Sequence, residues 1–376
     1  MKRHIEPYIL EDLKEKMVFV GGPRQVGKTT MSLNLLNNGS IHHPAYLSWD
    51  DINTKKALLD GALPSGEPLI ILDEIHKFKG WRNLVKGFYD LRKDSTQFCV
   101  TGSARLDYYR RGGDSLQGRY HYHRLHPLSL YELNTAPTRS DLEHMMEFGG
   151  FPEPCMRGNR RHYRRWQKEH RSRVIQEDIL TMEQVREFGQ IELLSQILPD
   201  RVGSPLSINN LRQDLQVAFE TAERWITIFE NLYYCFRIDP LGFPPLRMAQ
   251  KEKKLYMWDW SLCPDPAIRF ENLVASMLLK YCHHHEDWEG EIMTLHFMRD
   301  ARRREIDFVV VKNKKPLFAV ECKSGERKLS KNIPYFAPRT NIPTFYQVHK
   351  GEKDMEYPRH RARMLPITTL ATMLKI

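Results

Sequence analysis

The residues with the clearest chemistry form a glycine-rich loop near the start of the chain. Positions 22–29 read Gly-Pro-Arg-Gln-Val-Gly-Lys-Thr and fit the pattern G-x-x-x-x-G-K-[S/T] at every fixed position. The two glycines let such a loop wrap so that its N–H groups point at phosphate oxygens, and the hydroxyl of the last residue ligates Mg²⁺. We therefore predict a triphosphate site, with Lys28 on the β- and γ-phosphates, at Gly22, Pro23, Arg24, Gln25, Val26, Gly27, Lys28, Thr29 and the adjoining Thr30.

An acidic pair follows a short apolar run further along the chain. Residues 69–72 read Leu-Ile-Ile-Leu and lead directly into Asp73 and Glu74. A buried strand with this ending places Asp73 beside the phosphates, where it would hold Mg²⁺ through water. Glu74 would polarise the attacking water as general base. The same pair could instead be a helix N-cap and a first-turn acid, but the upstream loop favours the catalytic interpretation.

Hydroxyl groups end a third apolar run, and arginines follow it. Thr101 and Ser103 close the segment Gln-Phe-Cys-Val-Thr-Gly-Ser. If this strand lies between the other two, either hydroxyl can bond the γ-phosphate or the attacking water, although Thr-Gly-Ser is equally good turn chemistry. Fast turnover also requires an arginine for the charge of the transition state. Arg105 and Arg119 are candidates, and each is also consistent with an ordinary surface residue.

A second acidic group lies in the C-terminal part, where 305–311 and 316–323 predict two strands joined by a tight turn. A hairpin symmetric about residue 314 places Asp307 opposite Glu321, about 5 Å away. At an effective dielectric near 20 their repulsion is about 3 kcal/mol. Lys323, a divalent cation or both must offset it. The alternative is a solvated polar face neutralised by Lys323 and Arg302–Arg304.

Several elements must position these groups. Short apolar runs separated by helical stretches over residues 17–126 predict a parallel sheet with helices on both faces. Residues 127–190 are predicted to be helical, 191–262 have the character of a helix-turn-helix with a wing strand at Lys254, and the rest is predicted α+β. The expected strands of the first part are 17–20, 45–49, 69–72, 98–101 and 120–125.

Composition narrows the class of protein. The 376 residues carry a formal net charge of +10, which favours a polyanionic partner such as nucleic acid. The six cysteines are scattered, without a CxxC pair, so neither a disulfide framework nor a zinc knuckle is expected. The start lacks an apolar core of signal-peptide length and the longest apolar runs are strand-sized, so we expect a cytoplasmic protein without a membrane partner.

A basic run at residues 157–173 carries eight Arg or Lys and one Glu, interleaved with Tyr163 and Trp166. On one helix, a stripe of cations could track a phosphate backbone while the aromatic rings stack on bases. The alternative is a solvated connecting helix that pairs with acidic groups elsewhere. The residues that approximate one helical face are Arg157, Arg161, Arg164, Lys168 and Arg171.

The segments GGPRQVGKTT, LIILDEIHK, VTGSARL, LQGRYHYHRLHPLSLYEL and FGGFPEP together resemble a family of prokaryotic AAA-type ATPases. In that family the ATPase core precedes a C-terminal region of unknown function that resembles a winged helix followed by a PD-(D/E)xK endonuclease-like fold. The resemblance implies ATP as the nucleotide and Lys28, Thr29, Asp73 and Glu74 as the ATPase residues. By analogy it also implies a homo-oligomer with arginines supplied in trans.

The endonuclease-like resemblance assigns roles to the acidic hairpin. It implies that Asp307, Glu321 and the carbonyl of Cys322 hold Mg²⁺ and that Lys323 activates water or stabilises the developing charge. Glu271 matches the helix glutamate found in such folds. Three interpretations stay open: an active nuclease, a fold that binds nucleic acid without cutting it, and a plain polar surface.

The sequence thus predicts four segments: an α/β P-loop ATPase core at 1–135, a helical lid or linker with the basic stripe at 136–190, a winged-helix-like part at 191–262, and an α+β restriction-endonuclease-like domain at 263–376. The first hypothesis is an Mg-ATP-hydrolysing ATPase coupled to a nuclease-like domain that acts on or binds nucleic acid, with DNA favoured over RNA. The second is a nucleotide-regulated interaction protein whose nuclease-like fold is inactive.

Overall fold

The structure, a computed structural model, describes residues 1–36, 39–102, 116–174, 187–242, 252–326 and 328–376. The chain divides into two compact units, Met1–His126 and Pro127–Ile376, and each is described by itself.

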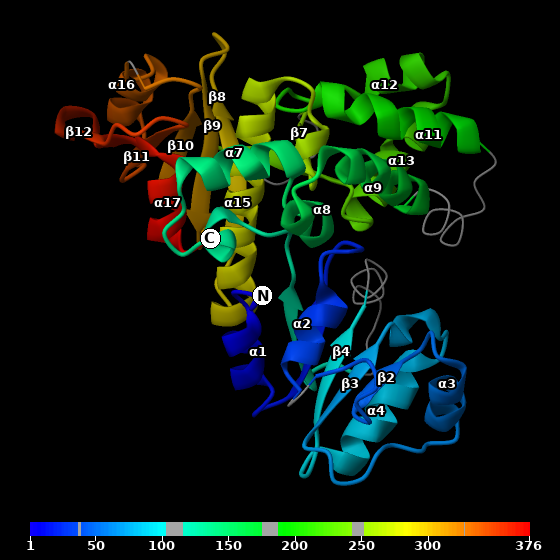
Figure 1. The fold of residues 1–376 in the computed structure, drawn as a ribbon. Coiled ribbons are helices and arrows are strands. Elements are labelled where there is room, and N and C mark those ends of the chain that lie inside the picture. The colour runs from blue at the N-terminus through cyan, green and yellow to red at the C-terminus, as the bar shows by residue number, and fades with distance from the viewer. Residues whose placement is uncertain (37–38, 103–115, 175–186, 243–251, 327) are drawn as a thin grey trace. The chain divides into compact units, whose positions relative to one another are not determined.

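A five-stranded parallel sheet forms the centre of the first unit (Figure 1). Its order is β2-β3-β4-β1-β5, and every neighbouring pair is parallel. The predicted parallel sheet is therefore confirmed, and β4 lies between β1 and β3, as the role expected of its terminal hydroxyl requires. The strands are β1 (Met17–Gly21), β2 (Tyr46–Ser48), β3 (Leu69–Asp73), β4 (Gln97–Thr101) and β5 (Tyr120–Arg124).

Helices cover both faces of this sheet because alternate strand side chains point to opposite sides. Met17 and Phe19 pack in one core cluster with Trp81 and Phe88 of a long helix. The intervening strand residues, such as Val18, pack in a second cluster with residues of the first two helices. All residues of β1 and β3 are buried, as a sheet covered on both faces demands. The helices among the described residues of this unit are α1 (Glu6–Asp12), α2 (Lys28–Asn34), α3 (Ile52–Leu59) and α4 (Trp81–Arg92).

Helices make up the first half of the second unit. After α6 (Leu130–Leu133), the structure describes α7 (Arg139–Phe148), α8 (Pro152–Arg157), α9 (Arg160–Arg173), α11 (Phe188–Ile197), α12 (Ile208–Leu215) and α13 (Phe219–Asn231). The longest helix, α15 (Pro266–Glu289), runs beside the strands of the C-terminal sheet (Figure 1). Two short helices, α16 (Asn332–Phe336) and α17 (Ile367–Leu374), lie nearer the C-terminus.

An eight-stranded mixed sheet forms the rest of the second unit, in the order β12-β13-β11-β10-β9-β8-β6-β7. The antiparallel pair β6–β7 follows the helices α11–α13, and β6 also pairs with β8. The predicted boundary at 262/263 therefore falls within segments that share one continuous sheet. The strands are β6 (Cys235–Pro240), β7 (Lys254–Met257), β8 (Met293–Arg299), β9 (Glu305–Lys312), β10 (Lys315–Cys322), β11 (Phe345–His349), β12 (Met355–Tyr357) and β13 (Ala362–Pro366).

The hairpin β9–β10 carries the C-terminal acidic group. Its two-residue turn places Asn313 and Lys314 at positive φ, 49° and 67°, as the twist of a tight hairpin favours. A bulge between Pro316 and Phe318 shifts the register by one, after which Val320 pairs with Phe308. Continuing this register by one residue sets Glu321 opposite Asp307, the pairing that the sequence predicts.

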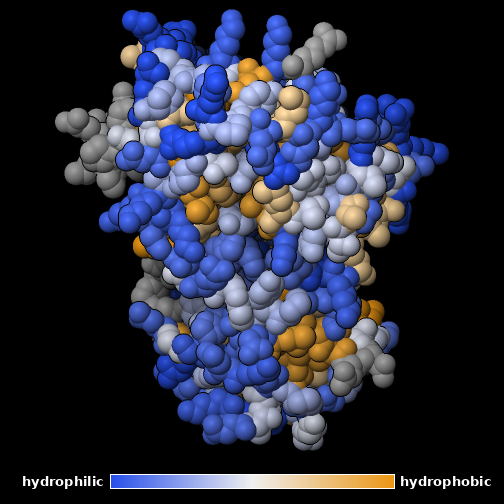
Figure 2. Space-filling model, turned by 90° about the vertical axis from the view of Figure 1, so that its left-hand side faces the viewer, coloured by the Kyte–Doolittle hydropathy of each residue, from blue (hydrophilic) through white to orange (hydrophobic). Residues whose placement is uncertain are grey.

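Figure 2 shows one face on which hydrophilic residues predominate and hydrophobic residues gather in separate patches. None of the described helices is long and apolar enough to cross a bilayer.

Candidate functional site

The glycine-rich loop joins β1 to α2, and its backbone requires glycine at defined points. Gly27 has φ 95° and Gly22 has φ 147°, both in the region that side chains disfavour. A Cβ atom on Gly22 would lie 2.3 Å from the carbonyl oxygen of Leu125, the residue after β5. Gln25 also has a positive φ, 60°. The loop is therefore tightly curved and packed against the segment that follows β5.

Lys28 turns its ammonium group back into the loop. Its Nζ donates to the carbonyl oxygens of Gly22 at 2.9 Å and Pro23 at 2.6 Å, and the residue is buried. A buried ammonium group is stable only when its protons are hydrogen-bonded. The loop thus presents a cation within its own curve, which is the donor arrangement that suits a phosphate group.

Asp73 lies at the carboxyl end of β3 and is the meeting point of three hydroxyl groups. Its Oδ2 accepts hydrogen bonds from Thr29 Oγ1 at 2.9 Å and from Tyr46 Oη at 2.6 Å. Thr101, at the end of β4, donates to the other carboxylate oxygen. The buried carboxylate therefore sits directly beside the loop hydroxyl predicted to ligate Mg²⁺, and hard oxygen donors of this kind suit that ion.

Tyr46 was not identified from the sequence, because it belongs to the three-residue strand β2 and to no motif. Burial, followed by its hydrogen bond to Asp73, raises the pKa of its phenol above the ordinary value. The phenol therefore stays protonated and acts as a donor to Asp73. Ser103, the other predicted hydroxyl, lies outside the described residues.

Glu74 follows in a left-handed backbone conformation with φ 56°. Its N–H donates to the Thr101 carbonyl at 3.0 Å, which ties the end of β3 to the end of β4. Its carboxylate oxygen lies 3.4 Å from Lys77 Nζ and 3.7 Å from His76 Nε2. Glu74 occupies the N-cap position of the short 3₁₀ helix Ile75–Lys77, where its side chain makes no capping hydrogen bond, and Asp73, the N-cap of the alternative, is the last residue of β3.

Of the two candidate arginines, Arg119 forms an ion pair with Asp90 of α4, with Nε 2.9 Å from Oδ1. Hydrogen bonding to Arg119 lowers the pKa of Asp90. This pairing agrees with the surface interpretation of Arg119. Arg105 lies outside the described residues.

A second group of polar residues surrounds the β9–β10 hairpin of the second unit. Glu321 is 2% exposed, and its Oε1 accepts hydrogen bonds from Lys323 Nζ and Ser330 Oγ, each at 2.8 Å. Its Oε2 is buried without a hydrogen-bond partner among the described residues. The Asp307 carboxylate accepts the N–H of Cys322 at 2.7 Å. A buried carboxylate oxygen without a donor is costly, and a cation would compensate for it.

Glu271 reaches the same region from α15. Its Oε1 accepts a hydrogen bond from Tyr256 Oη at 2.8 Å and lies 3.4 Å from Lys254 Nζ. Lys254 is itself buried and pairs with Glu305 at 2.5 Å. Strand β7 thus contributes a phenol and an ammonium group that sequence reasoning did not assign, because they precede the hairpin by some fifty residues.

The electrostatics connect these acids. Burial, followed by the charge of Asp307, raises the pKa of Glu271 to about 7 and that of Glu321 to about 7. Within the described ranges, however, no group of three or more His, Cys, Asp or Glu side chains is arranged to hold a metal ion. The predicted set of Glu271, Asp307 and Glu321 is therefore not assembled as three ligands in this structure, where Glu271 is bound to Tyr256 and Lys254. That Asp307, Glu321 and the carbonyl of Cys322 hold Mg²⁺ remains a prediction.

The basic run differs from the predicted stripe. Arg157 belongs to α8, and α9 begins only at Arg160 after the Asn159 cap, so the five cations do not share one helix. Trp166 is 2% exposed and stacks on His170 at 4.7 Å, and Tyr163 donates to the Ser261 carbonyl. The expectation that Trp166 stacks on bases is therefore wrong, because the apolar rings form the buried face of an otherwise basic helix.

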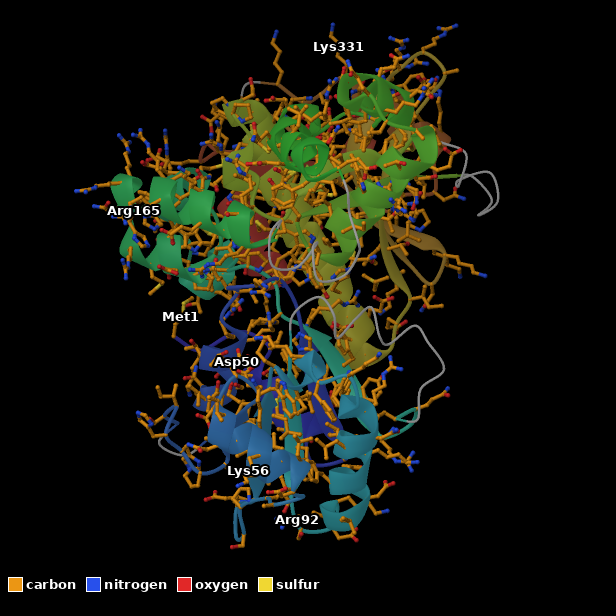
Figure 3. All side chains as sticks on the ribbon, turned by 90° about the vertical axis from the view of Figure 1, so that its right-hand side faces the viewer. Met1, Asp50, Lys56, Arg92, Arg165 and Lys331 are labelled. Carbon is orange, nitrogen blue, oxygen red and sulfur yellow. The ribbon has the colours of Figure 1, made fainter. Side chains whose placement is uncertain are left out.

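The cations of α9 point outward. Arg161, Arg164, Arg165 and Lys168 are exposed, and Figure 3 shows Arg165 extending away from the helix. Around the acidic hairpin, exposed cations also occur at Arg302, Arg303, Lys323, Lys328 and Lys331. Lys331 likewise extends outward in Figure 3.

Comparisons with known proteins agree with this description of the first unit. Residues 14–134 match the family described as AAA domain. Residues 139–267 and 268–370 match two families described as domains of unknown function, DUF8612 and DUF4143. The first match covers both the five-stranded parallel sheet and the glycine-rich loop, so the first unit is similar to AAA domains.

Individual relatives are distant. An uncharacterised protein of Methanocaldococcus jannaschii is 21% identical over 85% of this chain and 78% of its own length. Among solved structures, Orc1 of Aeropyrum pernix in complex with DNA is 13% identical, covering 73% of this chain and 93% of that chain, with a TM-score of 0.33. The RuvB Holliday junction branch migration motor of Thermotoga maritima is 17% identical, covering 62% and 87%, with a TM-score of 0.28.

Proposed function

We propose that the first unit binds ATP with Mg²⁺ and hydrolyses it. The observation that carries this proposal is the 2.9 Å contact between Thr29 Oγ1 and Asp73 Oδ2, beside a loop that encloses the Lys28 ammonium group. Residues from β3, the loop and β4 must all fold correctly to bring these groups together. A surface loop without a ligand has no need for such an arrangement.

The side chains then have defined tasks. Lys28 would exchange its hydrogen bonds to the loop carbonyls for the β- and γ-phosphates. Thr29 and Asp73 would hold the cation, which would supply positive charge to the phosphoryl group. Thr101 and Tyr46 fix the orientation of the Asp73 carboxylate through their hydroxyl groups. Glu74, the next residue, orients and polarises the attacking water.

Two substitutions test this function. Lys28→Ala should abolish nucleotide binding, whereas Glu74→Gln should retain binding and lose turnover. Lys79→Ala is the matched control, because Lys79 is an exposed lysine outside the loop. Titration of the purified protein with Mg-ATP and a phosphate-release assay report the two effects. Undetectable binding of any nucleotide to the unmodified protein would refute the proposal.

We further propose that the second unit acts on nucleic acid, DNA before RNA, at the Asp307–Glu321–Lys323 hairpin. Support comes from the buried Glu321 oxygen, which has no hydrogen-bond partner within the part of the chain that the structure describes, and from the exposed cations around it, which suit a phosphate backbone. A divalent cation at Asp307 and Glu321 would supply Lewis-acid chemistry to a phosphodiester. Lys323 would then hold Glu321 in place and stabilise negative charge.

The runner-up is a nucleotide-regulated interaction protein without nuclease activity. The pairing of Lys254 with Glu271 and Glu305 favours it, because an ammonium group there already supplies positive charge to the acids. Incubation of DNA and RNA with Mg²⁺ or Mn²⁺ separates the two. Cleavage that is lost in Asp307→Asn and Lys323→Met, but kept in the exposed-acid control Asp354→Asn, supports the nuclease. Binding without cleavage under every condition supports the runner-up.

The exposed cations of α9 offer a second surface for nucleic acid. Replacing Arg161, Arg164, Arg165 and Lys168 with alanine should weaken DNA binding and flatten its dependence on salt, by a slope of about 0.9 for each phosphate that is no longer neutralised. Arg139→Ala is the control, because Arg139 is an exposed arginine that pairs with Glu143 on α7. An unchanged salt dependence would show that DNA does not bind at the cations of α9.

A further inference from the structure

Arg3 is charged, buried and outside every motif of the sequence. It is 6% exposed, although it lies only two residues from the N-terminus. Its Nη1 donates to the carbonyl oxygen of Val26 at 2.8 Å, and its Nη2 donates to that of His126 at 2.6 Å. One guanidinium group therefore joins the glycine-rich loop to the last residue of the first unit.

The segment Leu125–His126 contacts the loop at its other end as well. The Leu125 N–H donates to the Gly21 carbonyl at 2.8 Å, and the Leu125 carbonyl blocks any side chain at Gly22. The start of the loop thus packs directly on this segment, and its end is tied to the same segment through Arg3. The loop is held at both ends by two residues that follow β5.

The backbone of Arg3 is held in place by Glu6. Its backbone N–H donates to Glu6 Oε1 at 2.7 Å, and the same carboxylate oxygen accepts from Asn34 Nδ2 at 3.1 Å. Glu6 is buried. Ordering a long side chain is entropically unfavourable, and these contacts fix the backbone from which the guanidinium group extends.

The contact with Val26 has a consequence for the loop's donors. In a planar trans peptide the C=O and the following N–H point in opposite directions. By holding the Val26 oxygen on its own side, Arg3 directs the Gly27 N–H away from itself. A loop peptide that flipped would present an oxygen to phosphate instead, and the flip would break the hydrogen bond from the buried Nη1 of Arg3 to the Val26 carbonyl, which is unfavourable.

We propose that Arg3 is a positioning residue for nucleotide binding, which locks the Val26–Gly27 peptide of the loop and ties it to His126. This inference rests on the proposed ATP site. Because Pro127 begins the second unit, the same guanidinium group links the nucleotide loop to the segment through which the two units are covalently joined.

The test uses the full-length protein with Arg3→Ala. The substitution removes two hydrogen bonds from a charged donor, so we expect Mg-ATP to bind about 10- to 100-fold more weakly. KM should rise by that factor while kcat changes less than about threefold, because the missing interaction orders the loop before and during the reaction alike. Low concentrations of guanidinium chloride should restore part of the affinity by refilling the vacated position.

The control is Ile9→Val, at a buried position of α1 in the same core cluster as Val26, because an aliphatic side chain donates no hydrogen bond to a loop carbonyl. The Ile9→Val variant should have a lower thermal stability and an unchanged KM. Guanidinium chloride should not increase its affinity for Mg-ATP. If Arg3→Ala binds ATP within twofold of the unmodified protein, or if Ile9→Val raises KM equally, the positioning role is overturned. If the unmodified protein binds no nucleotide, it is the ATP site that fails.

Discussion

Gly22→Ala is the substitution for which the structure allows the most definite expectation. The new Cβ would lie 2.3 Å from the Leu125 carbonyl oxygen, whereas ordinary contact begins near 3.4 Å. Loop and segment must therefore separate by about 1 Å, and the atom in the way is backbone, which cannot rotate aside. Alanine at φ 147° adds backbone strain of about 1–3 kcal/mol.

The consequence for turnover follows from the displacement. A misplacement of about 1 Å can cost about 100-fold in rate when it disturbs groups that position a substrate. We therefore expect kcat/KM for ATP hydrolysis to fall about 100-fold, with weaker binding of Mg-ATP. Phosphate release at several ATP concentrations, together with direct titration of the nucleotide, measures both quantities.

The matched control is Gly61→Ala. Gly61 also has a positive φ, 74°, but a Cβ there meets nothing within 4 Å, and the residue is remote in sequence from the loop. It should lose stability through strain alone and keep its kcat/KM. Should Gly22→Ala hydrolyse ATP within about threefold of the unmodified protein, the argument that Leu125 shapes the loop would be refuted.

Three further predictions concern buried groups. Thr101→Val removes a hydroxyl donor from Asp73, so we expect a loss of about 1–3 kcal/mol in the free energy of unfolding and slower ATP turnover, measured by denaturant titration and phosphate release. Burial raises the pKa of Glu321 from its ordinary 4.5 to about 7, so its charged form is disfavoured in the folded state. In metal-free buffer, stability should therefore fall as pH rises from about 4.5 to 7, by on the order of 3 kcal/mol, and Glu321→Gln should flatten that slope. A slope that persists in the variant would assign it to other groups. Trp166→Ala should lower the free energy of unfolding by about 3–5 kcal/mol, because the ring is buried in the core. The folded variant should bind DNA normally. A loss of DNA affinity as large as that of the α9 variant would contradict the buried role.

Much of the first unit could be predicted because its signals are local. The strand runs, the loop and the acidic pair at Asp73 are contiguous in sequence, and parallel strands bring their carboxyl ends to one edge. The role predicted for the Thr101 hydroxyl depended on β4 lying between β1 and β3, and the strand order of the structure has β4 there. The pairing of Asp307 with Glu321 in the hairpin could also be predicted, although it depends on a bulge between Pro316 and Phe318 that the sequence pattern does not indicate.

Other features could not be predicted from pattern alone. The basic run at 157–173 has cations at helical spacing, but the break at Gly158 and Asn159 divides them between two helices. Trp166 could have faced either solvent or core, and only packing against Phe151 and His170 decided it. Periodicity identifies the faces of a helix without saying which neighbour covers them.

The sequence by itself determined the phosphate loop, the acid that ends β3 and the alternation of strands and helices around them. Tertiary structure alone decided that Tyr46 bonds Asp73, that Arg3 joins Val26 to His126, and that Lys254 pairs with Glu271. These partners are 17 to 123 residues apart and share no repeating pattern. Their contacts exist because burial obliges each polar group to find a partner wherever the fold brings one within reach.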